Sequence, residues 1–335
     1  MFVHADEEVK VEEKSAVKQK APVVKVKKEK LRGKRLVDKY KAQAQLFLMI
    51  VPMMVITFIF CYWPLRGWQM AFYNYKPAKG YKGSKYVGFG KFEMLFKDKI
   101  FWQDMVNTLA MSLMILVFGT LITITFALLL NEIRSLGFKK FVQLFSYLPH
   151  FLSWVIVCSL VADILSSSNG TLNNLLISMH IIDKPVLWLG KPEYFWWINL
   201  FSNVWKETGW NAIIYIAAMA GIDQALYEAA EIDGAGRFRK MWHVTLPGIK
   251  STMIVILIMN LGWILNGGFE LPYLLGKGLV LDRAETIDLF VLKYGITNGD
   301  YSLATAAGIF KSVISIILVT STNWVSNKLG ESSLM

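Results

Sequence analysis

Uncharged apolar blocks, long enough to cross a bilayer, are the feature that most limits what this chain can fold into. A hydrocarbon core about 30 Å thick requires roughly 20 apolar residues in a helix. Four blocks approach or exceed that length without a single Asp, Glu, Lys or Arg: residues 46–64, 106–130, 142–162 and 251–269. They predict membrane-spanning helices and exclude an ordinary soluble globular domain.

Two further blocks are long but carry charge. Residues 195–220 contain Lys206 and Glu207 near their middle, and residues 302–326 contain Lys311. Their length still favours spanning, and only 18% of the whole chain is charged, against about 25% in ordinary soluble domains. The sequence therefore predicts an all-α integral membrane protein with six transmembrane helices.

Proline and glycine predict where two of these helices are irregular. Pro149 lies inside the block 142–162 and should bend it, because proline removes a helical hydrogen bond. Gly267, Gly268 and Pro272 should fray or bend the end of the block 251–269.

The first 41 residues differ in composition from the rest, with 13 basic against 7 acidic residues and no apolar period. We expect a basic cytoplasmic tail, largely disordered, followed by one transmembrane permease domain over residues 42–335. Positive residues beside membrane helices are retained inside, so six passes place both termini in the cytoplasm. The loop 65–105 opposes this rule with eight basic residues. Nucleic-acid binding is not expected, because acids interrupt the tail and no aromatic residues are interleaved.

Metal and thiol chemistry have no support in the sequence. Cys61 and Cys158 both fall inside apolar blocks and form no CxxC pair. The four histidines are scattered without HExxH spacing. We expect no metal site and no enzymatic activity in this chain.

The most informative segment is residues 224–248, in the largest predicted cytoplasmic loop. Helix-forming residues precede Gly234 and Gly236, which permit either a left-handed turn or a close backbone approach. A second short amphipathic stretch follows, and Pro247 can open the next membrane helix because the first turn needs no proline N–H. A short helix, a tight turn and a second helix of this kind are suited to docking in a groove of a soluble partner.

This segment resembles the EAA loop of permease subunits of type I ABC importers. Glu228-Ala229-Ala230, Asp233-Gly234-Ala235 and Leu246-Pro247 stand at the spacing of that motif, with Val244 where the family has Ile. The resemblance implies that the loop couples the permease to an ATPase. The implied coupling residues are Glu228, Ala229, Ala230, Asp233, Gly234, Ala235, Arg237, Leu246 and Pro247.

The resemblance extends from about residue 45 to about residue 330, and several stretches in this range resemble the LplB-like polysaccharide permeases. The basic tail takes no part in it. The stretches that carry it are Tyr75-Lys76-Pro77, Val87-Gly88-Phe89, Asn107-Thr108-Leu109, Leu128-Leu129-Leu130-Asn131-Glu132, Tyr147-Leu148-Pro149-His150-Phe151-Leu152-Ser153-Trp154, Trp205-Lys206-Glu207-Thr208-Gly209-Trp210 and Asn298-Gly299-Asp300-Tyr301-Ser302.

What the resemblance implies is a subunit of an oligosaccharide importer in a bacterial plasma membrane. Its implied partners are a second homologous permease, two ATP-binding subunits and an extracellular sugar-binding lipoprotein, with membrane lipid around it. The chain itself has no GxxxxGK[ST] loop to hold phosphates. ATP and Mg²⁺ are therefore expected on the partner ATPase, and no cofactor in this chain.

Polar residues inside two of the predicted helices mark a candidate substrate path, because such residues usually face a bundle interior or a water-filled route. Amides beside an aromatic ring suit a sugar, whose hydroxyls bond the amides while the ring covers its apolar face. Helix packing through interhelical hydrogen bonds is the alternative, and Lys206–Glu207 also fits an internal salt bridge. The candidate residues are Asn199, Asn203 and Glu207 on one helix, and Asn260, Trp263 and Asn266 on the next.

Two other classes of function stay open. A secondary transporter or channel would need an ionisable relay or filter, and only Lys206, Glu207 and Lys311 are available in the blocks. A membrane enzyme could use the acidic residues around Asp233, but no nearby His or DxD spacing supports it. The sequence does not identify the sugar: lysines in the loop 65–105 suit an acidic saccharide or contact with the binding lipoprotein.

Overall fold

The computed structural model describes residues 43–266 and 268–328. Contacts along the chain divide it into two units, Met1–Pro64 and Leu65–Met335. In the described part of the first unit, α2 (Ala44–Thr57) continues into the π-helical turn η1 (Phe58–Tyr62). The basic tail expected over residues 1–41 lies outside the described residues, so its disorder stays a prediction.

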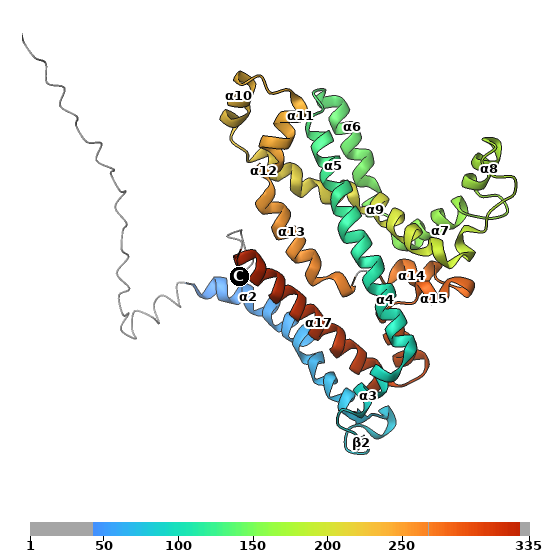
Figure 1. The fold of residues 1–335 in the computed structure, drawn as a ribbon. Helices are drawn as coiled ribbons and strands as arrows, with labels where there is room; N and C mark the ends of the chain where they lie inside the picture. Colours follow the sequence, from blue (N-terminus) through green and yellow to red (C-terminus); the bar gives the residue numbers. More distant parts are fainter. Residues whose placement is uncertain (1–42, 267, 329–335) are drawn as a thin grey trace, which may run out of the picture. The chain divides into compact units, whose positions relative to one another are not determined.

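The second unit is helical throughout its described residues except for loops and one small hairpin, in which β1 (Tyr73–Asn74) pairs antiparallel with β2 (Lys85–Tyr86). Figure 1 shows how its helices follow one another. Its first helices are η2 (Trp63–Phe72), which begins at the unit boundary, η3 (Pro77–Lys79), α3 (Gly90–Lys97), α4 (Lys99–Met114), η4 (Ile115–Gly119), α5 (Thr120–Asn131), α6 (Leu136–Tyr147), η5 (Leu148–Phe151), α7 (Trp154–Ile164), α8 (Thr171–Ser178), η6 (Trp188–Gly190) and α9 (Pro192–Ala220). The later ones are α10 (Gln224–Ile232), α11 (Arg237–Lys240), η7 (Met241–Thr245), α12 (Leu246–Gly248), α13 (Lys250–Gly262), η8 (Ile264–Asn266), α14 (Glu270–Leu275), η9 (Gly278–Val280), α15 (Leu281–Ala284), α16 (Ile287–Leu292), η10 (Lys293–Thr297) and α17 (Tyr301–Lys328).

Three helices in the described chain are long and apolar enough to cross a membrane: Leu46–Phe72, Lys99–Asn131 and Tyr301–Lys328. Two bent pairs raise the number to five if each pair is one span. α9 has 29 residues and is long enough as well, but it carries Lys206 and Glu207 near its centre. The predicted six spans are compatible with this set, and their number stays a prediction.

The sequence predicted one bent helix over the block 142–162. The structure instead has two helices, with a bend of 103° between them. Pro149 lies inside η5, and the chain turns beyond it, where Leu152 and Ser153 take extended backbone angles. The Ser153 side chain then accepts a hydrogen bond from the Ile156 amide over 3.4 Å and caps α7. Proline therefore ends the regular part of α6, and the serine cap starts a new helix in a new direction.

The block 251–269 is also shorter as a helix than predicted. α13 ends at Gly262, before the glycine pair expected to fray it, and Pro272 lies inside the separate helix α14. The residues that follow form the 3-10 turn η8, whose Ile264 and Leu265 are buried in a core cluster with residues of α4, α16 and α17. Burial of these two side chains in the cluster explains why the α-helix ends at this point.

α9 is the element that most others contact, with α4, α5, α6, α7, α13 and α15 among its neighbours. Its crossing with α6 is close at Gly209. A Cβ atom at this position would lie 2.9 Å from the Ser146 Cβ, and closer still to the Ser146 carbonyl group. Only glycine permits the two helices to approach this far.

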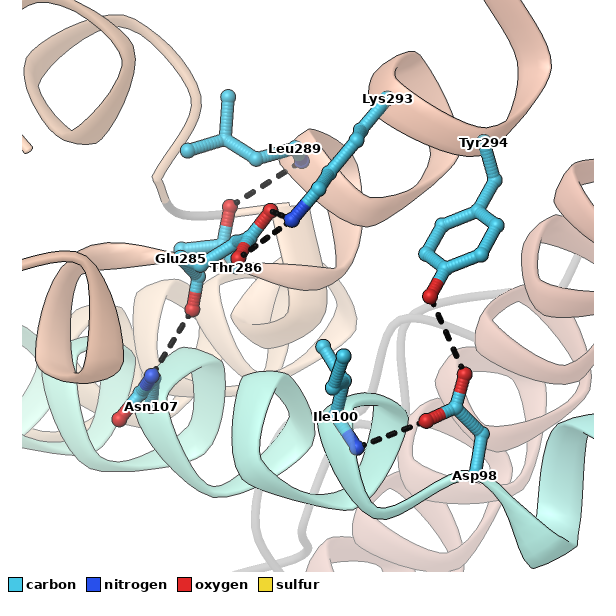
Figure 2. Close-up of polar contacts among 8 residues, drawn as sticks. All are labelled: Asp98, Ile100, Asn107, Glu285, Thr286, Leu289, Lys293 and Tyr294. Carbon is cyan, nitrogen blue, oxygen red and sulfur yellow. Dashed lines mark hydrogen bonds and ion pairs between the residues drawn. The ribbon is translucent and has the colours of Figure 1, made fainter. Parts of the chain in front are cut away.

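The segment from α15 to η10 is fastened to α4 by buried polar side chains. The Asn107 amide donates to the carbonyls of Asp282 and Glu285, each over 3.0 Å, and the Thr108 hydroxyl accepts from the Ile287 amide. Figure 2 shows Asn107 meeting Glu285, whose carboxylate also accepts from Lys293. The hydrogen bond to Glu285 raises the pKa of Lys293. Asn107 and Thr108 therefore have a structural role, which is to hold this segment against α4.

We predict that Gly209→Ala destabilises the protein, because the added methyl group overlaps the Ser146 backbone. Overpacking of this kind costs about 1–3 kcal/mol. Gly308→Ala on α17 is a matched control, since no atom lies within 4 Å of a Cβ built there. It should be neutral or stabilise by up to about 1 kcal/mol. Thermal unfolding of both variants in detergent tests this, and equal melting temperatures would contradict the close crossing.

Candidate functional site

The predicted helix–turn–helix of residues 224–248 is present, and its turn is a left-handed helix cap. Asp223 caps the start of α10, since its side chain accepts from the Ala225 amide, and beyond the end of the helix Gly234 takes a φ of +74°. The Gly234 amide donates to the Glu231 carbonyl and the Ala235 amide to the Ala230 carbonyl, over 3.0 and 2.8 Å. This pair of bonds is the Schellman motif.

The structure shows one of the two reasons for a glycine at position 234. Within this chain a Cβ built there meets no atom within 4 Å, so no neighbouring residue of the chain limits the space. The positive φ favours glycine, because a side chain in the left-handed region costs roughly 1–2 kcal/mol.

The second half of the loop returns to the membrane helices through α11, the π-helical turn η7 and α12. Tyr227 of α10 meets the buried Thr245 of η7, hydroxyl to hydroxyl over 2.9 Å, and Lys240 pairs with Glu231 over 3.1 Å. A 57° bend then separates this stretch from α13. The two short helices are therefore tied to each other and joined directly to a long helix.

Most of the predicted coupling residues point outward. Glu228, Ala229, Asp233, Gly234 and Arg237 are exposed, as is Pro247, whereas Ala230, Ala235 and Leu246 are half-buried.

Three large apolar side chains on the same loop were not singled out by the sequence analysis. Ile232, Phe238 and Trp242 are 87%, 79% and 64% exposed. Their apolar character within a segment otherwise rich in charge was the signal that could have revealed them. They give the loop an apolar surface suited to a protein groove.

The loop also contacts the end of α5. Arg237 lies 3.9 Å from Glu132, which follows α5, and these residues border a polar pocket of about 500 Å³ together with Arg134, Glu231 and Lys240. The residues after α5 and the helix–turn–helix therefore lie at the same end of the unit.

A second candidate site is a cavity of about 340 Å³ between α4, α5, α9 and α13. Its wall is largely aliphatic and aromatic, with Ile214, Tyr215, Ile256 and Trp263 among the apolar members. The polar side chains on the wall are Ser112, Thr120, Thr123, Asn203, Glu207, Thr208, Asn211 and Asn260.

The structure brings four of the six predicted path residues to this cavity: Asn203, Glu207, Asn260 and Trp263. Asn199 is not on the wall. It is 1% exposed, and its carbonyl oxygen accepts from the Asn203 amide over 2.9 Å. Asn266 is exposed in η8, away from the wall.

Several wall residues were missed. Asn211 continues the four-residue series of Asn203 and Glu207, and Ser112, Thr120 and Thr123 are polar residues within an uncharged block, so the sequence did carry a signal for each.

The predicted salt bridge is also present, with the Lys206 ammonium 3.2 Å from the Glu207 carboxylate. Lys206 is 5% exposed, and Glu207 additionally meets Nδ1 of His150 over 2.7 Å. Among the described residues, no group of three His, Cys, Asp or Glu side chains could hold a metal ion.

We predict that Gly234→Ala loosens the cap of α10. At about 1–2 kcal/mol for a left-handed alanine, the Ala235 amide should exchange with solvent roughly tenfold faster. Gly236→Ala is the control, because Gly236 has a φ of −69° and open space around it. Hydrogen exchange that rises equally in both variants would show that the left-handed turn does not hold the loop.

Comparison with known proteins places these two sites in a family context. Residues 119–331 match the model of the family described as binding-protein-dependent transport system inner membrane component. Protein LplB of Bacillus subtilis is 40% identical over 294 residues, which are 88% of this chain and 92% of that protein. The B. subtilis polygalacturonan/rhamnogalacturonan transport system permease protein YteP is 41% identical over 92% of this chain and 95% of its own length.

Solved structures give the same result. A chain of a bacterial alginate ABC transporter, crystallised in complex with an alginate pentasaccharide-bound periplasmic protein, is 38% identical with a TM-score of 0.82. The match covers 90% of this chain and 100% of that chain.

Proposed function

This chain belongs to the binding-protein-dependent transport system inner membrane component family, and we propose that it is a transmembrane subunit of an ATP-driven oligosaccharide importer. One observation carries the proposal. A match that covers 90% of this chain relates it to a chain of a bacterial transporter that imports the acidic polysaccharide alginate. The relative named for polygalacturonan and rhamnogalacturonan transport supports a saccharide as cargo. The chain is a transport subunit and not an enzyme.

The proposed assembly contains this chain, a second homologous permease, two ATP-binding subunits and an extracellular sugar-binding lipoprotein. The periplasmic protein in the alginate transporter complex supports the last of these. ATP and Mg²⁺ would be bound by the ATPase subunits. The exposed apolar side chains Ile232, Phe238 and Trp242, beside the predicted EAA residues, fit the docking of this loop in an ATPase groove.

In this proposal the EAA loop and both termini lie in the cytoplasm of a bacterial cell. The ion pair between Arg237 and Glu132 supports one part of it, because it joins the loop to the end of α5. Six passes with a cytoplasmic N-terminus place both the segment after α5 and the EAA loop on the cytoplasmic side, and this contact is consistent with that.

The cavity of about 340 Å³ is the proposed sugar path in this subunit. Amides of Asn203 and Asn260 could bond saccharide hydroxyls, and the ring of Trp263, 70% exposed, could cover the apolar face of a pyranose. Three of its walls connect to the EAA loop: α9 directly precedes α10, α13 directly follows α12, and α5 ends beside Arg237. Closure of the ATPase could therefore move several walls of the path together. Nucleotide drives such a change only through its different affinity for the two states.

Uptake into proteoliposomes that contain the complete transporter tests the function. We expect labelled oligosaccharide to enter only when ATP is inside and the binding protein is outside, with no need for an ion gradient. A secondary transporter would show the opposite pattern, with uptake that requires an ion gradient and ignores ATP. That result would overturn the proposal.

We predict that Asn203→Ala and Trp263→Ala each lower saccharide uptake about tenfold, the effect of losing one good contact worth roughly 1.4 kcal/mol. Asn266→Ala, which lies off the cavity wall, should leave uptake near normal and serves as the comparison. The measurement is uptake per assembled complex, so that poor assembly is not counted. Normal transport in the first two variants would show that this cavity is not on the path.

A further inference from the structure

Glu207 is the one charged residue among the described residues that line the cavity. Every other lining side chain is apolar or carries a neutral amide or hydroxyl group. Charged groups within a membrane are costly and usually functional. The carboxylate is 30% exposed, so it is not sealed inside the helix bundle.

The carboxylate is held at both of its oxygen atoms. Nδ1 of His150 donates to Oε2 over 2.7 Å, and the Lys206 ammonium lies 3.2 Å from Oε1. Lys206 also donates to the His150 carbonyl over 2.6 Å. The His150 ring stacks on Trp210 with centroids 4.4 Å apart and planes within 2°. These contacts fix the orientation of the Glu207 side chain.

The acceptor capacity of this carboxylate is only half used. An ionised carboxylate offers about four lone-pair positions, and two of them are filled by His150 and Lys206. Lys206 itself is buried, so a molecule in the cavity would meet the Glu207 carboxylate and not the Lys206 ammonium group. Two carboxylate oxygens side by side match two parallel donors, and hydroxyls on neighbouring carbons of a sugar ring supply such donors.

Stability alone does not explain the cluster. Replacing a buried ion pair by apolar residues is often neutral or stabilising, and a pair that serves packing need not face a cavity. Lys311 with Asp288 is such a pair, since neither residue borders the cavity. Glu207 differs from it by opening onto the wall.

We propose that Glu207 selects pyranose units that carry two free hydroxyls on neighbouring carbons, with His150 and Lys206 as its positioning residues. The inference rests on the oligosaccharide import proposed above and specifies how this subunit orients the sugar. In a uronate, the diol lies across the ring from the carboxylate. An acidic saccharide would therefore turn its diol to Glu207 and its carboxylate away from it.

The test compares saccharides as well as variants in the complete reconstituted transporter. The probes are an alginate pentasaccharide, a galacturonate pentasaccharide and maltopentaose, each with a derivative whose neighbouring free hydroxyls are O-methylated. Each is supplied at a concentration that saturates the binding protein, measured separately. Where the binding protein rejects the methylated form, a deoxy analogue that lacks one of the two hydroxyls replaces it.

Wild type should import the unmodified saccharide about tenfold faster than the modified one, the effect of losing a hydrogen bond to a charged group. The Glu207→Gln variant should import the unmodified and the modified saccharide at the same reduced rate, so the ratio of the two rates should be near one. Glu193→Gln, an exposed carboxylate in the first turn of the same helix, should keep the wild-type ratio. A purely structural role would lower both rates and leave the ratio unchanged, which would overturn the proposal.

Two variants of His150 test whether discrimination depends on its Nδ1–H donor or on its stacked ring. His150→Asn keeps a donor near the Nδ1 position but loses the stack on Trp210, whereas His150→Phe keeps a stacking ring and has no donor. We expect the Asn variant to retain most of the discrimination and the Phe variant to lose it, and the reverse order would refute the positioning role. If wild type imports none of the three saccharides, the import proposal itself fails, which is a different result from import without discrimination.

Discussion

Backbone hydrogen bonding is the constraint on which the rest of this structure depends, because lipid offers no water to satisfy a free carbonyl or amide. The apolar helices of this chain are nevertheless interrupted, and polar side chains from other elements donate hydrogen bonds to the backbone carbonyls at the interruptions. Lys206 of α9 donates to the carbonyl of His150 at the corner between α6 and α7, over 2.6 Å. Thr286 donates to the carbonyl of Gly268 beyond η8, over 3.1 Å. Irregular backbone survives at these places because buried donors reach it.

The same interruptions build the candidate path. The end of α13 at Gly262 leaves Trp263 on the cavity wall, 70% exposed. The corner between α6 and α7 brings His150 against Glu207, whose carboxylate opens into the cavity. A straight pair of helices would have had no such corner to hold the carboxylate. Packing, backbone satisfaction and the proposed sugar contacts therefore share one set of residues around the middle of α9.

Sequence reasoning predicted what periodicity controls and missed what tertiary partners control. The block 195–220 is α9, and Asn203 and Glu207 reach one cavity as their spacing indicated. A helix of 3.6 residues per turn drifts by about 40° for each step of four, so Asn199 rotates off that wall while Asn211 stays on it. At the break between α6 and α7, Pro149 and the Ser153 cap are local features, whereas the donor that satisfies the His150 carbonyl is the distant Lys206. The early end of α13 depends on burial of apolar side chains against distant helices. No local pattern contains these distant contacts.

The proposed coupling between the EAA loop and the cavity follows from how the walls are attached. The contact of Arg237 with Glu132 joins partly exposed groups 3.9 Å apart, and pairs of that kind contribute about 0–1 kcal/mol. It is too weak to move α5 by itself. The covalent links are stronger: α9 enters α10 within a few residues, and α12 enters α13 at the buried Ile249. Because α5 packs along α9, a displacement of the loop would reach α9 and α13 through the backbone and α5 through packing. The ion pair would then keep the end of α5 in register with the loop and would not drive its movement.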